Sequence, residues 1–284
     1  MLVERRFDTG EVVLNYAEGP NNGPPLILMH GVSGTWKYLL PIIDATINRW
    51  HIYAFDMRGH GKSGKTPNKY KLLDYARDIG NFIEKELTEP PALFGHSLGG
   101  MVSTIIAGSH KDSIRGIVIG DSQLNINSRE TFDRFRNNEP LIQAFTTIRD
   151  ISATDLSPLD KVKKIYGHPL RNTSRNTGYS YDGHDSTAIG CWVDCTTSYE
   201  LYLELNEGYD CDRLFKEITC PILLVQSNNI LGGVMVDKDV EYISSVHNDV
   251  THVYLENAGH IMGLDVGNIG WVNSPLRLFL ESIR

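Results

Sequence analysis

The segment PALFGHSLGG, residues 91–100, constrains the fold of this chain more than any other feature of the sequence. A short apolar run enters a glycine turn and continues into small residues, which predicts a strand, a sharp turn and the start of a helix. Ser97 stands in this turn between Gly95 and Gly99, in the pattern G-x-S-x-G. Such a turn leaves no room for side chains beside the serine and holds the hydroxyl clear of the sheet at a helix N-terminus. The segment therefore predicts an exposed nucleophilic serine.

The first 120 or so residues alternate short apolar runs with helical stretches. The predicted buried strands are PPLILMHG (24–31), HIYAFDMRGHG (51–61), the run before Ser97, and IRGIVIGDSQ (114–123). Because strands that alternate with helices imply right-handed crossovers, we expect an α/β fold with a mostly parallel central sheet flanked by helices. The strand pattern returns in CPILLVQS (220–227) and THVYLENAGH (251–260), and PLRLFLESI (275–283) predicts a closing helix.

Residues 123–215 break this pattern. They are more polar, are helical in parts and contain no buried strand run. We therefore predict an α/β core of residues 1–122 and 216–284, interrupted by a helical cap of residues 123–215 over the carboxyl edge of the sheet, where open α/β sheets bind ligands. The aromatic residues of the cap fit either a pocket wall or the core of the cap itself, and we prefer the second interpretation. They are Tyr179, Tyr181, Trp192, Tyr199 and Tyr202.

Composition excludes several classes of partner. The net charge of -8 argues against nucleic acid and anionic membranes. No run approaches the roughly 20 apolar residues of a membrane span, and the N-terminus carries no apolar signal region, so we expect a cytoplasmic protein. We interpret the cysteines, which are Cys191, Cys195, Cys211 and Cys220, as reduced. No metal-ligand spacing or nucleotide fingerprint appears, so we expect neither a metal nor a cofactor.

Three further features suit a hydrolytic serine. His260 follows the last predicted strand, from which a general base can reach the hydroxyl of Ser97. The amide of Leu98 lies at the predicted helix N-terminus, and the amide of Val32 follows an earlier strand. We predict that these two amides form an oxyanion hole, with Gly31 allowing the backbone to approach closely.

The motifs HGVSG, DMRGHGKSG, GHSLGG and AGH, in this order, resemble the α/β-hydrolase superfamily of esterases, lactonases, thioesterases and related enzymes. The resemblance covers residues 24–122 and 216–284. It implies a small-molecule, ester-type substrate, and it implies that the turn containing Asp56 and Arg58 is structural. Gly31 and His96, which lie inside these motifs, are predicted to border the substrate.

The position of the acidic residue expected to pair with His260 differs from the usual pattern of this family. The acid usually follows the strand that corresponds to PILLVQ, but here the segment 227–233 reads SNNILGG and holds no carboxylate. A minority of the family carries the acid one strand earlier, where this chain has Asp121. Asp237 and Asp239 are rivals, although DKDVEYI predicts the start of a helix. We predict a carboxylate oxygen of Asp121 within about 3 Å of His260 Nδ1.

The function predicted from sequence is hydrolysis of a carboxylic ester through an acyl-enzyme on Ser97. Because the same residues support other chemistry, hydrolysis of a lactone, a thioester or a carbon–carbon bond stays open. A ligand-binding receptor that keeps a hydrolase-like site is an alternative from another class. The substrate and the oligomeric state do not follow from the sequence.

Overall fold

A single sheet of eight strands organises the protein, in the order β1-β2-β4-β3-β5-β6-β7-β8. The computed structural model describes residues 1–110, 112–166, 184–264 and 270–284. The strands from β4 to β8 pair in parallel, and β1 and β2 add an antiparallel hairpin at one edge. The strands are β1 (Val3–Asp8), β2 (Val13–Glu18), β3 (Pro25–Met29), β4 (His51–Asp56), β5 (Ala92–His96), β6 (Gly116–Gly120), β7 (Ile222–Ser227) and β8 (Val250–Leu255). The prediction of a mostly parallel α/β sheet is confirmed.

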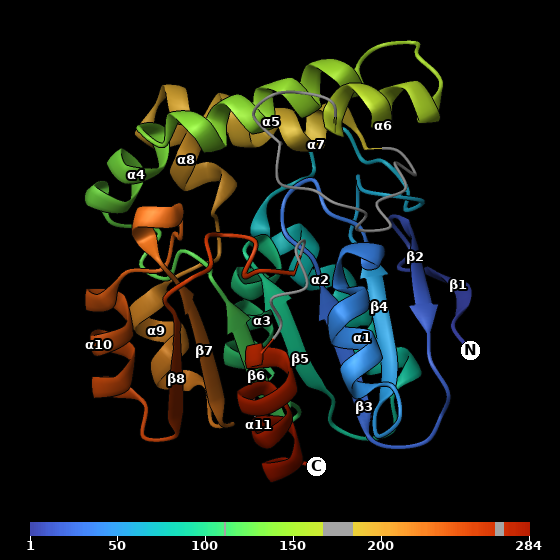
Figure 1. Cartoon of the computed structure of the whole chain (residues 1–284), viewed down its shortest axis with the longest axis vertical. Coiled ribbons are helices and arrows are strands. Elements are labelled where there is room, and N and C mark those ends of the chain that lie inside the picture. The colour runs from blue at the N-terminus through green and yellow to red at the C-terminus, as the bar shows by residue number, and fades with distance from the viewer. Residues whose placement is uncertain (111, 167–183, 265–269) are drawn as a thin grey trace.

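Helices cover both faces of this sheet (Figure 1). One face carries α1 (Leu40–Thr46) and α11 (Arg277–Ser282), and the other carries α2 (Leu72–Glu86), α3 (Leu98–Ser109), α9 (Cys211–Glu217) and α10 (Asp237–Val246). Neighbouring residues of β3 belong to different layers, because side chains of a strand point alternately to its two faces. Leu26 and Leu28 pack with the α1 and α11 layer, and Ile27 and Met29 pack with the α2 and α3 layer. Burial on both sides explains why these strands read as unbroken apolar runs.

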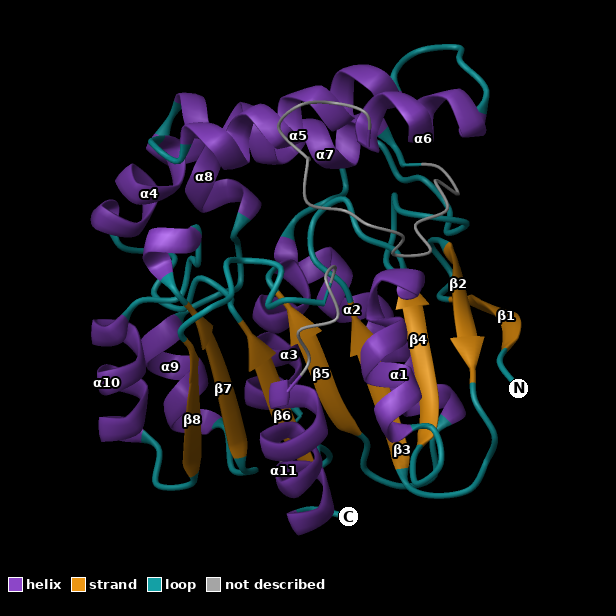
Figure 2. Cartoon of the chain, viewed as in Figure 1, coloured by secondary structure: helices purple, strands orange, loops and turns teal. Residues whose placement is uncertain are grey.

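Between β6 and β7 the chain forms a group of helices above the carboxyl ends of the strands (Figure 2). They are α4 (Arg129–Arg136), α5 (Glu139–Ser152), α6 (Pro158–Tyr166), α7 (Ser186–Asp194) and α8 (Tyr199–Leu205). Within the described part of residues 123–215, no segment joins the main sheet. The insertion predicted from sequence is therefore helical. The exact limits of the predicted cap stay a prediction, and α9, which begins at Cys211, packs against α3 beside the sheet.

Polar residues fix where the helices of the insertion begin. The side chains of Ser128, Asn138, Asp185 and Ser198 each accept a hydrogen bond from a backbone N–H in the first turn of α4, α5, α7 and α8, respectively. Such a cap satisfies one of the N–H groups that a helix start leaves without a partner, and it contributes about 1 kcal/mol. Part of the polar character of this segment therefore comes from the capping residues at which its helices begin.

Shorter elements complete the chain. They are the 3-10 helices η1 (Trp36–Leu39), η3 (Cys195–Thr197) and η4 (Asn229–Leu231), and the π-helical turn η5 (Val272–Leu276). The predicted closing helix is divided: η5 contains Pro275, and α11 continues from Arg277. All the cysteines of the chain are free thiols. Among the described residues, no helix combines the length and the apolar character that crossing a membrane requires.

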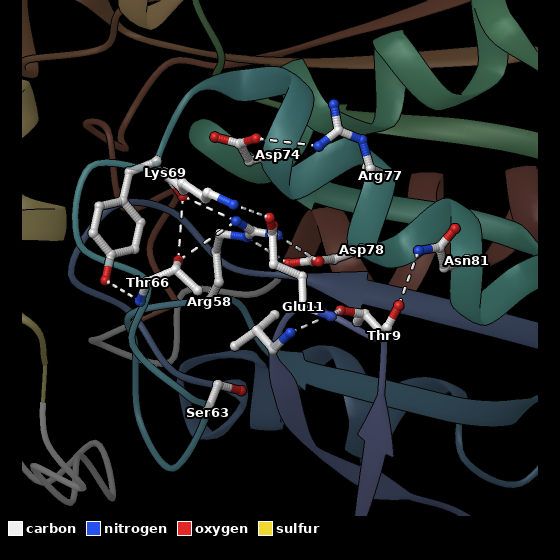
Figure 3. Close-up of polar contacts among 12 residues, drawn as sticks. Thr9, Glu11, Arg58, Ser63, Thr66, Lys69, Asp74, Arg77, Asp78 and Asn81 are labelled. Carbon is white, nitrogen blue, oxygen red and sulfur yellow. Dashed lines mark hydrogen bonds and ion pairs between the residues drawn. The ribbon is translucent and has the colours of Figure 1, made fainter.

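A buried ion cluster joins the edge hairpin to the helical layer (Figure 3). Arg58, only 1% exposed, donates from Nε and Nη2 to the two carboxylate oxygens of Asp78 on α2, at 2.7 Å each. Its Nη2 also donates to Glu11, in the turn between β1 and β2, at 2.8 Å, and its Nη1 donates to the carbonyl of Lys69 at 3.0 Å. These contacts hold three separate segments together, which is the arrangement of a structural arginine.

Candidate active site

Ser97 lies in a strained turn between β5 and α3. Its φ of 54° and ψ of -115° are unusual for a residue with a side chain. Glycines make this turn possible: a Cβ added at Gly95 would lie 2.1 Å from the carbonyl oxygen of Gly99, and one at Gly99 would lie 2.4 Å from that of Met29. Ser122 reinforces the turn, because its hydroxyl donates to the carbonyl of Ser97 at 2.9 Å. The sequence reading of this segment as strand, sharp turn and helix agrees with the structure.

Two backbone amides near Ser97 have no acceptor in the part of the chain that the structure describes. Leu98 is the first residue of α3, where the helix offers its N–H no acceptor. Neither Leu98 nor Val32 donates a backbone hydrogen bond to another described residue. Gly31 brings the chain before Val32 close to Ser97, because a Cβ added at Gly31 would lie 3.1 Å from the Cβ of Ser97. The oxyanion hole predicted from these two amides stays a proposal.

His260 connects Ser97 to a carboxylate. Its Nε2 lies 3.1 Å from Ser97 Oγ, and its Nδ1 lies 2.7 Å from Asp121 Oδ2. Because a carboxylate accepts hydrogen bonds, Nδ1 carries the proton, and Nε2 is left to accept from the serine hydroxyl. The Asp121–His260 distance predicted from sequence agrees with the structure. The catalytic roles of the three residues stay a proposal.

Asp121 is held by backbone amides from the end of β7 and the loop that follows it. It is fully buried and has a positive φ of 36°. Its Oδ1 accepts from the N–H of Ser227 at 3.1 Å and of Met235 at 3.3 Å, and its Oδ2 accepts from the N–H of Val234 at 3.0 Å. The loop that holds the acid in most of the family therefore supplies donors that orient an acid from β6. Sequence reasoning missed these donors, because any residue except proline has a backbone N–H.

The rival carboxylates face other partners. Asp237 begins α10, and its Oδ1 accepts from Gln226 Nε2 at 2.6 Å. Asp239 is 3% exposed, and its burial raises the pKa of its carboxyl group. Its Oδ2 lies 3.5 Å from the backbone nitrogen of Asn125. No ion pair between His260 and either residue is present in the described chain, where His260 pairs with Asp121.

His96 supports the loop that carries His260. Its Nε2 donates to the carbonyl of His260 at 2.8 Å, and the two rings lie 4.8 Å apart. Burial lowers the pKa of His96 to about 3, so the ring is neutral. His96 and Gly31 are not among the described residues that line the cavity at Ser97. Their predicted contact with substrate stays a prediction. In the structure, His96 contacts His260 and Tyr38, and Gly31 lies close to His96 and Ser97.

A mainly apolar cavity opens onto Ser97 and His260. The space between its lining residues, counted together with the open solvent at its mouth, is about 320 Å³. The core contributes Val32, Met101 and Val234 to its wall, and the segment between β6 and β7 contributes Gln123, Phe135, Leu141, Phe145 and Trp192. None of the described lining residues is a lysine, an arginine or a carboxylate. The sequence did not predict most of these lining residues. Apolar residues of a helix have the same spacing whether they line a cavity or pack in a core.

The aromatic residues of the insertion divide between the two interpretations. Trp192 lines the cavity, whereas Tyr202 is fully buried among other aromatic rings. Tyr199 is partly buried and packs against the same cluster. Tyr179 and Tyr181 lie outside the described residues. Within the described chain, no group of three or more histidine, cysteine or carboxylate side chains is arranged to hold a metal.

The fold and the site define a hydrolase of the α/β type. A model of the family described as the alpha/beta hydrolase fold matches residues 24–265, and the chain belongs to this family. The match includes Ser97, Asp121 and His260. The resemblance predicted from the motifs is therefore confirmed.

Individual relatives act on different substrates. The chain is similar to 2-(acetamidomethylene)succinate hydrolase of Mesorhizobium japonicum, with 26% identity over 262 residues that cover 91% of this chain and 89% of the relative. Its structure is similar to that of a bacterial membrane phospholipase A, with a TM-score of 0.74 and 19% identity, covering 100% of this chain and 87% of the other. It is also similar to a thermophilic esterase of Thermogutta terrifontis, with a TM-score of 0.69 and 18% identity, covering 100% and 99%. At such identities, the structural likeness shows the fold alone.

Proposed function

We propose that this protein hydrolyses carboxylic esters of small molecules, with Ser97 as nucleophile, His260 as general base and Asp121 as the acid that orients it. The observation that carries the proposal is the continuous hydrogen-bond chain from Ser97 Oγ through His260 to Asp121. Beside it lie the amides of Val32 and Leu98, which donate to no other described residue. A serine hydroxyl is a weak nucleophile, and a base at its proton is what activates it.

The proposed reaction proceeds in two halves. Ser97 Oγ attacks the ester carbonyl carbon while its proton passes to His260 Nε2, and the carbonyl oxygen becomes an oxyanion that accepts from Val32 and Leu98. The oxyanion collapses, the carbon–oxygen bond to the alcohol breaks, and Nε2 returns the proton to the leaving oxygen. Water then gives a proton to Nε2 and attacks the acyl-enzyme, which releases the acid and restores the Ser97 hydroxyl. Asp121 stabilises the imidazolium that forms in each half.

The cavity supports an uncharged substrate. The relative from Mesorhizobium japonicum is named for a succinate, which carries two carboxylates. The wall of this cavity offers apolar side chains and no described cation to such a substrate. A neutral ester with an apolar acyl group suits this wall better, because a carboxylate buried without a partner is costly. Lactones and thioesters present the same electrophilic carbonyl and stay alternatives, as does carbon–carbon bond hydrolysis on the same residues.

Two measurements test the proposal. A fluorophosphonate probe should label the protein on Ser97 and not label the Ser97→Ala variant. The protein should then hydrolyse p-nitrophenyl esters of neutral acyl chains faster than it hydrolyses lactones, thioesters or p-nitrophenyl succinate. If the probe labels Ser97 but the protein hydrolyses no ester, the substrate is one of the alternatives, a lactone, a thioester or a compound with a cleavable carbon–carbon bond. Absence of both labelling and turnover would favour the hydrolase-like receptor.

A further inference from the structure

One side chain in the cavity has hydrogen-bonding capacity that the described protein does not use. Gln123 follows Asp121 and Ser122 in the chain, is 9% exposed, and lines the cavity together with Ser97 and His260. Its Oε1 has a partner, the hydroxyl of Tyr202 at 3.3 Å. Its Nε2 has no acceptor among the described residues, yet it is not one of the fully buried polar atoms that lack a partner. Nε2 is therefore partly accessible, on a residue that lines the cavity.

Tyr202 determines which end of the Gln123 amide is available. Tyr202 lies on α8 and is fully buried, with its ring packed 5.3 Å from that of Phe132 and 5.8 Å from that of Phe135. The hydroxyl of Tyr202 donates to Gln123 Oε1. This hydrogen bond leaves Nε2 as the end of the amide that has no partner among the described residues, and an NH₂ group can only donate.

Trp192 also lines the cavity, but its indole N–H does not open onto it. Trp192 Nε1 is fully buried and has no acceptor in the described chain, so a ligand oxygen does not reach it in this structure. The described wall thus offers an accessible neutral donor, Gln123 Nε2, and no lysine, arginine or carboxylate beside it. Its complement is an uncharged oxygen acceptor on an otherwise apolar group.

We propose that Gln123 determines substrate specificity by donating a hydrogen bond from Nε2 to a neutral oxygen, such as a ketone, in the acyl group of the substrate. The apolar wall around it holds the remainder of the acyl chain. This inference rests on the proposed ester hydrolysis and narrows it to esters of neutral acids that carry one internal oxygen acceptor.

Matched pairs of substrates test this preference. The p-nitrophenyl esters of 4-oxopentanoate and pentanoate form one pair, and those of 5-oxohexanoate and hexanoate form the other. In each pair only the ketone differs. We expect kcat/KM for the oxo ester to exceed that for its partner by about tenfold in at least one pair, which is the effect of one hydrogen bond to a neutral group. The ratio within a pair removes changes that affect both esters equally.

Variants assign the preference to the amide. Gln123→Leu, which has a similar volume, should reduce the ratio to about one. Tyr202→Phe should reduce the ratio in part, because the amide becomes free to turn. Gln143→Leu, at an exposed position of α5, is the matched control and should keep the wild-type ratio. If Gln123→Leu does not fold, Tyr202→Phe still tests the proposal.

The outcomes separate this inference from the proposed function. A wild-type ratio of one or less in both pairs, or a ratio that survives both Gln123→Leu and Tyr202→Phe, overturns the role of Gln123 while ester hydrolysis by Ser97 stands. If the protein hydrolyses none of the four esters and Ser97 is not labelled by a fluorophosphonate, the proposed function itself is overturned.

Discussion

Asp121 and His260 are 139 residues apart in the chain, and their side chains meet at 2.7 Å. The contact is possible because β6 and β8 end at the same edge of a parallel sheet, with only β7 between them. The loop after β7 does not supply the carboxylate. Instead, the backbone N–H groups of Ser227, at the end of β7, and of Val234 and Met235, in the loop, donate to the carboxylate of Asp121, which follows the neighbouring strand β6.

Replacement of Asp121 by asparagine should reduce kcat by about 10⁴-fold, because the amide removes the charge that stabilises the imidazolium and changes the tautomer of His260. Asp237→Asn provides a matched control, since Asp237 contacts Gln226 and lies at the start of α10. Steady-state kinetics on one p-nitrophenyl ester, with circular dichroism to check folding, makes the comparison. An Asp121→Asn variant that keeps most of its turnover, or an Asp237→Asn variant that loses as much, would show that the acid lies elsewhere.

The Ser97→Ala variant should fold normally, because alanine is smaller than serine and the space of the turn is already set by Gly95 and Gly99. Its turnover should fall by about 10⁶-fold, to the rate that binding and the oxyanion hole supply alone. The measurement combines single-turnover kinetics with covalent labelling. Wild-type-like hydrolysis by Ser97→Ala is incompatible with the mechanism proposed above.

The sequence predicted Ser97, His260 and Asp121, because the turn and the strand ends that position them require particular residue types. A turn around Ser97 requires glycine at Gly95 and Gly99, because a Cβ at either position would overlap a backbone carbonyl group. His260 and Asp121 follow predicted strands, and strand ends of a parallel sheet share one edge. The support of Asp121 was not predictable in the same way, because it comes from backbone amides, which every residue except proline has.

The cavity wall was not predictable from sequence for a different reason. Phe135 and Phe145 lie on helices of the insertion, and helical periodicity shows that one face of a helix is apolar without showing what that face contacts. Gln123 gave no signal either, because a single glutamine after a strand has no characteristic pattern. Its importance depends on Tyr202, which is 79 residues away in the chain.

Removal of the Arg58 side chain should destabilise the protein strongly. Arg58→Met leaves the carboxylate of Asp78, 2% exposed, without its bidentate partner. Breaking a buried ion pair from one side costs about 3–5 kcal/mol of unfolding free energy. Arg77→Met, on the same helix as Asp78, removes an exposed arginine that pairs with Asp74 at 3.5 Å, and should cost less than about 1 kcal/mol.

Urea unfolding of the two arginine variants measures this difference. The double variant Arg58→Met with Asp78→Leu should recover part of the lost stability, because it removes the unpaired charge as well. If Arg58→Met and Arg77→Met have the same unfolding free energy, Arg58 does not hold the hairpin and α2 together.

The stability of the protein should decrease as the pH falls below 6.5. Burial lowers the pKa of His30, His60 and His96 to about 3, from the ordinary value of 6.5. Between these values the unfolded chain binds protons that the folded chain does not, so acid favours unfolding. The stabilisation from each neutral histidine is complete above pH 6.5 and is lost as the pH falls toward 3. Each residue is expected to contribute up to about 2 kcal/mol to the decrease between pH 7.5 and pH 5.

His60→Asn tests the origin of this pH dependence. His60 donates from Nδ1 to the carbonyl of Arg58 at 2.9 Å, and its Nε2 is buried without a partner in the described chain. Asparagine can reproduce the Nδ1 donor and does not titrate, so the variant should lose less unfolding free energy than the wild type between pH 7.5 and pH 5. Urea titrations of both proteins at the two pH values give the comparison. The same pH dependence in both proteins would mean that His60 takes up its proton in the folded state as readily as in the unfolded chain.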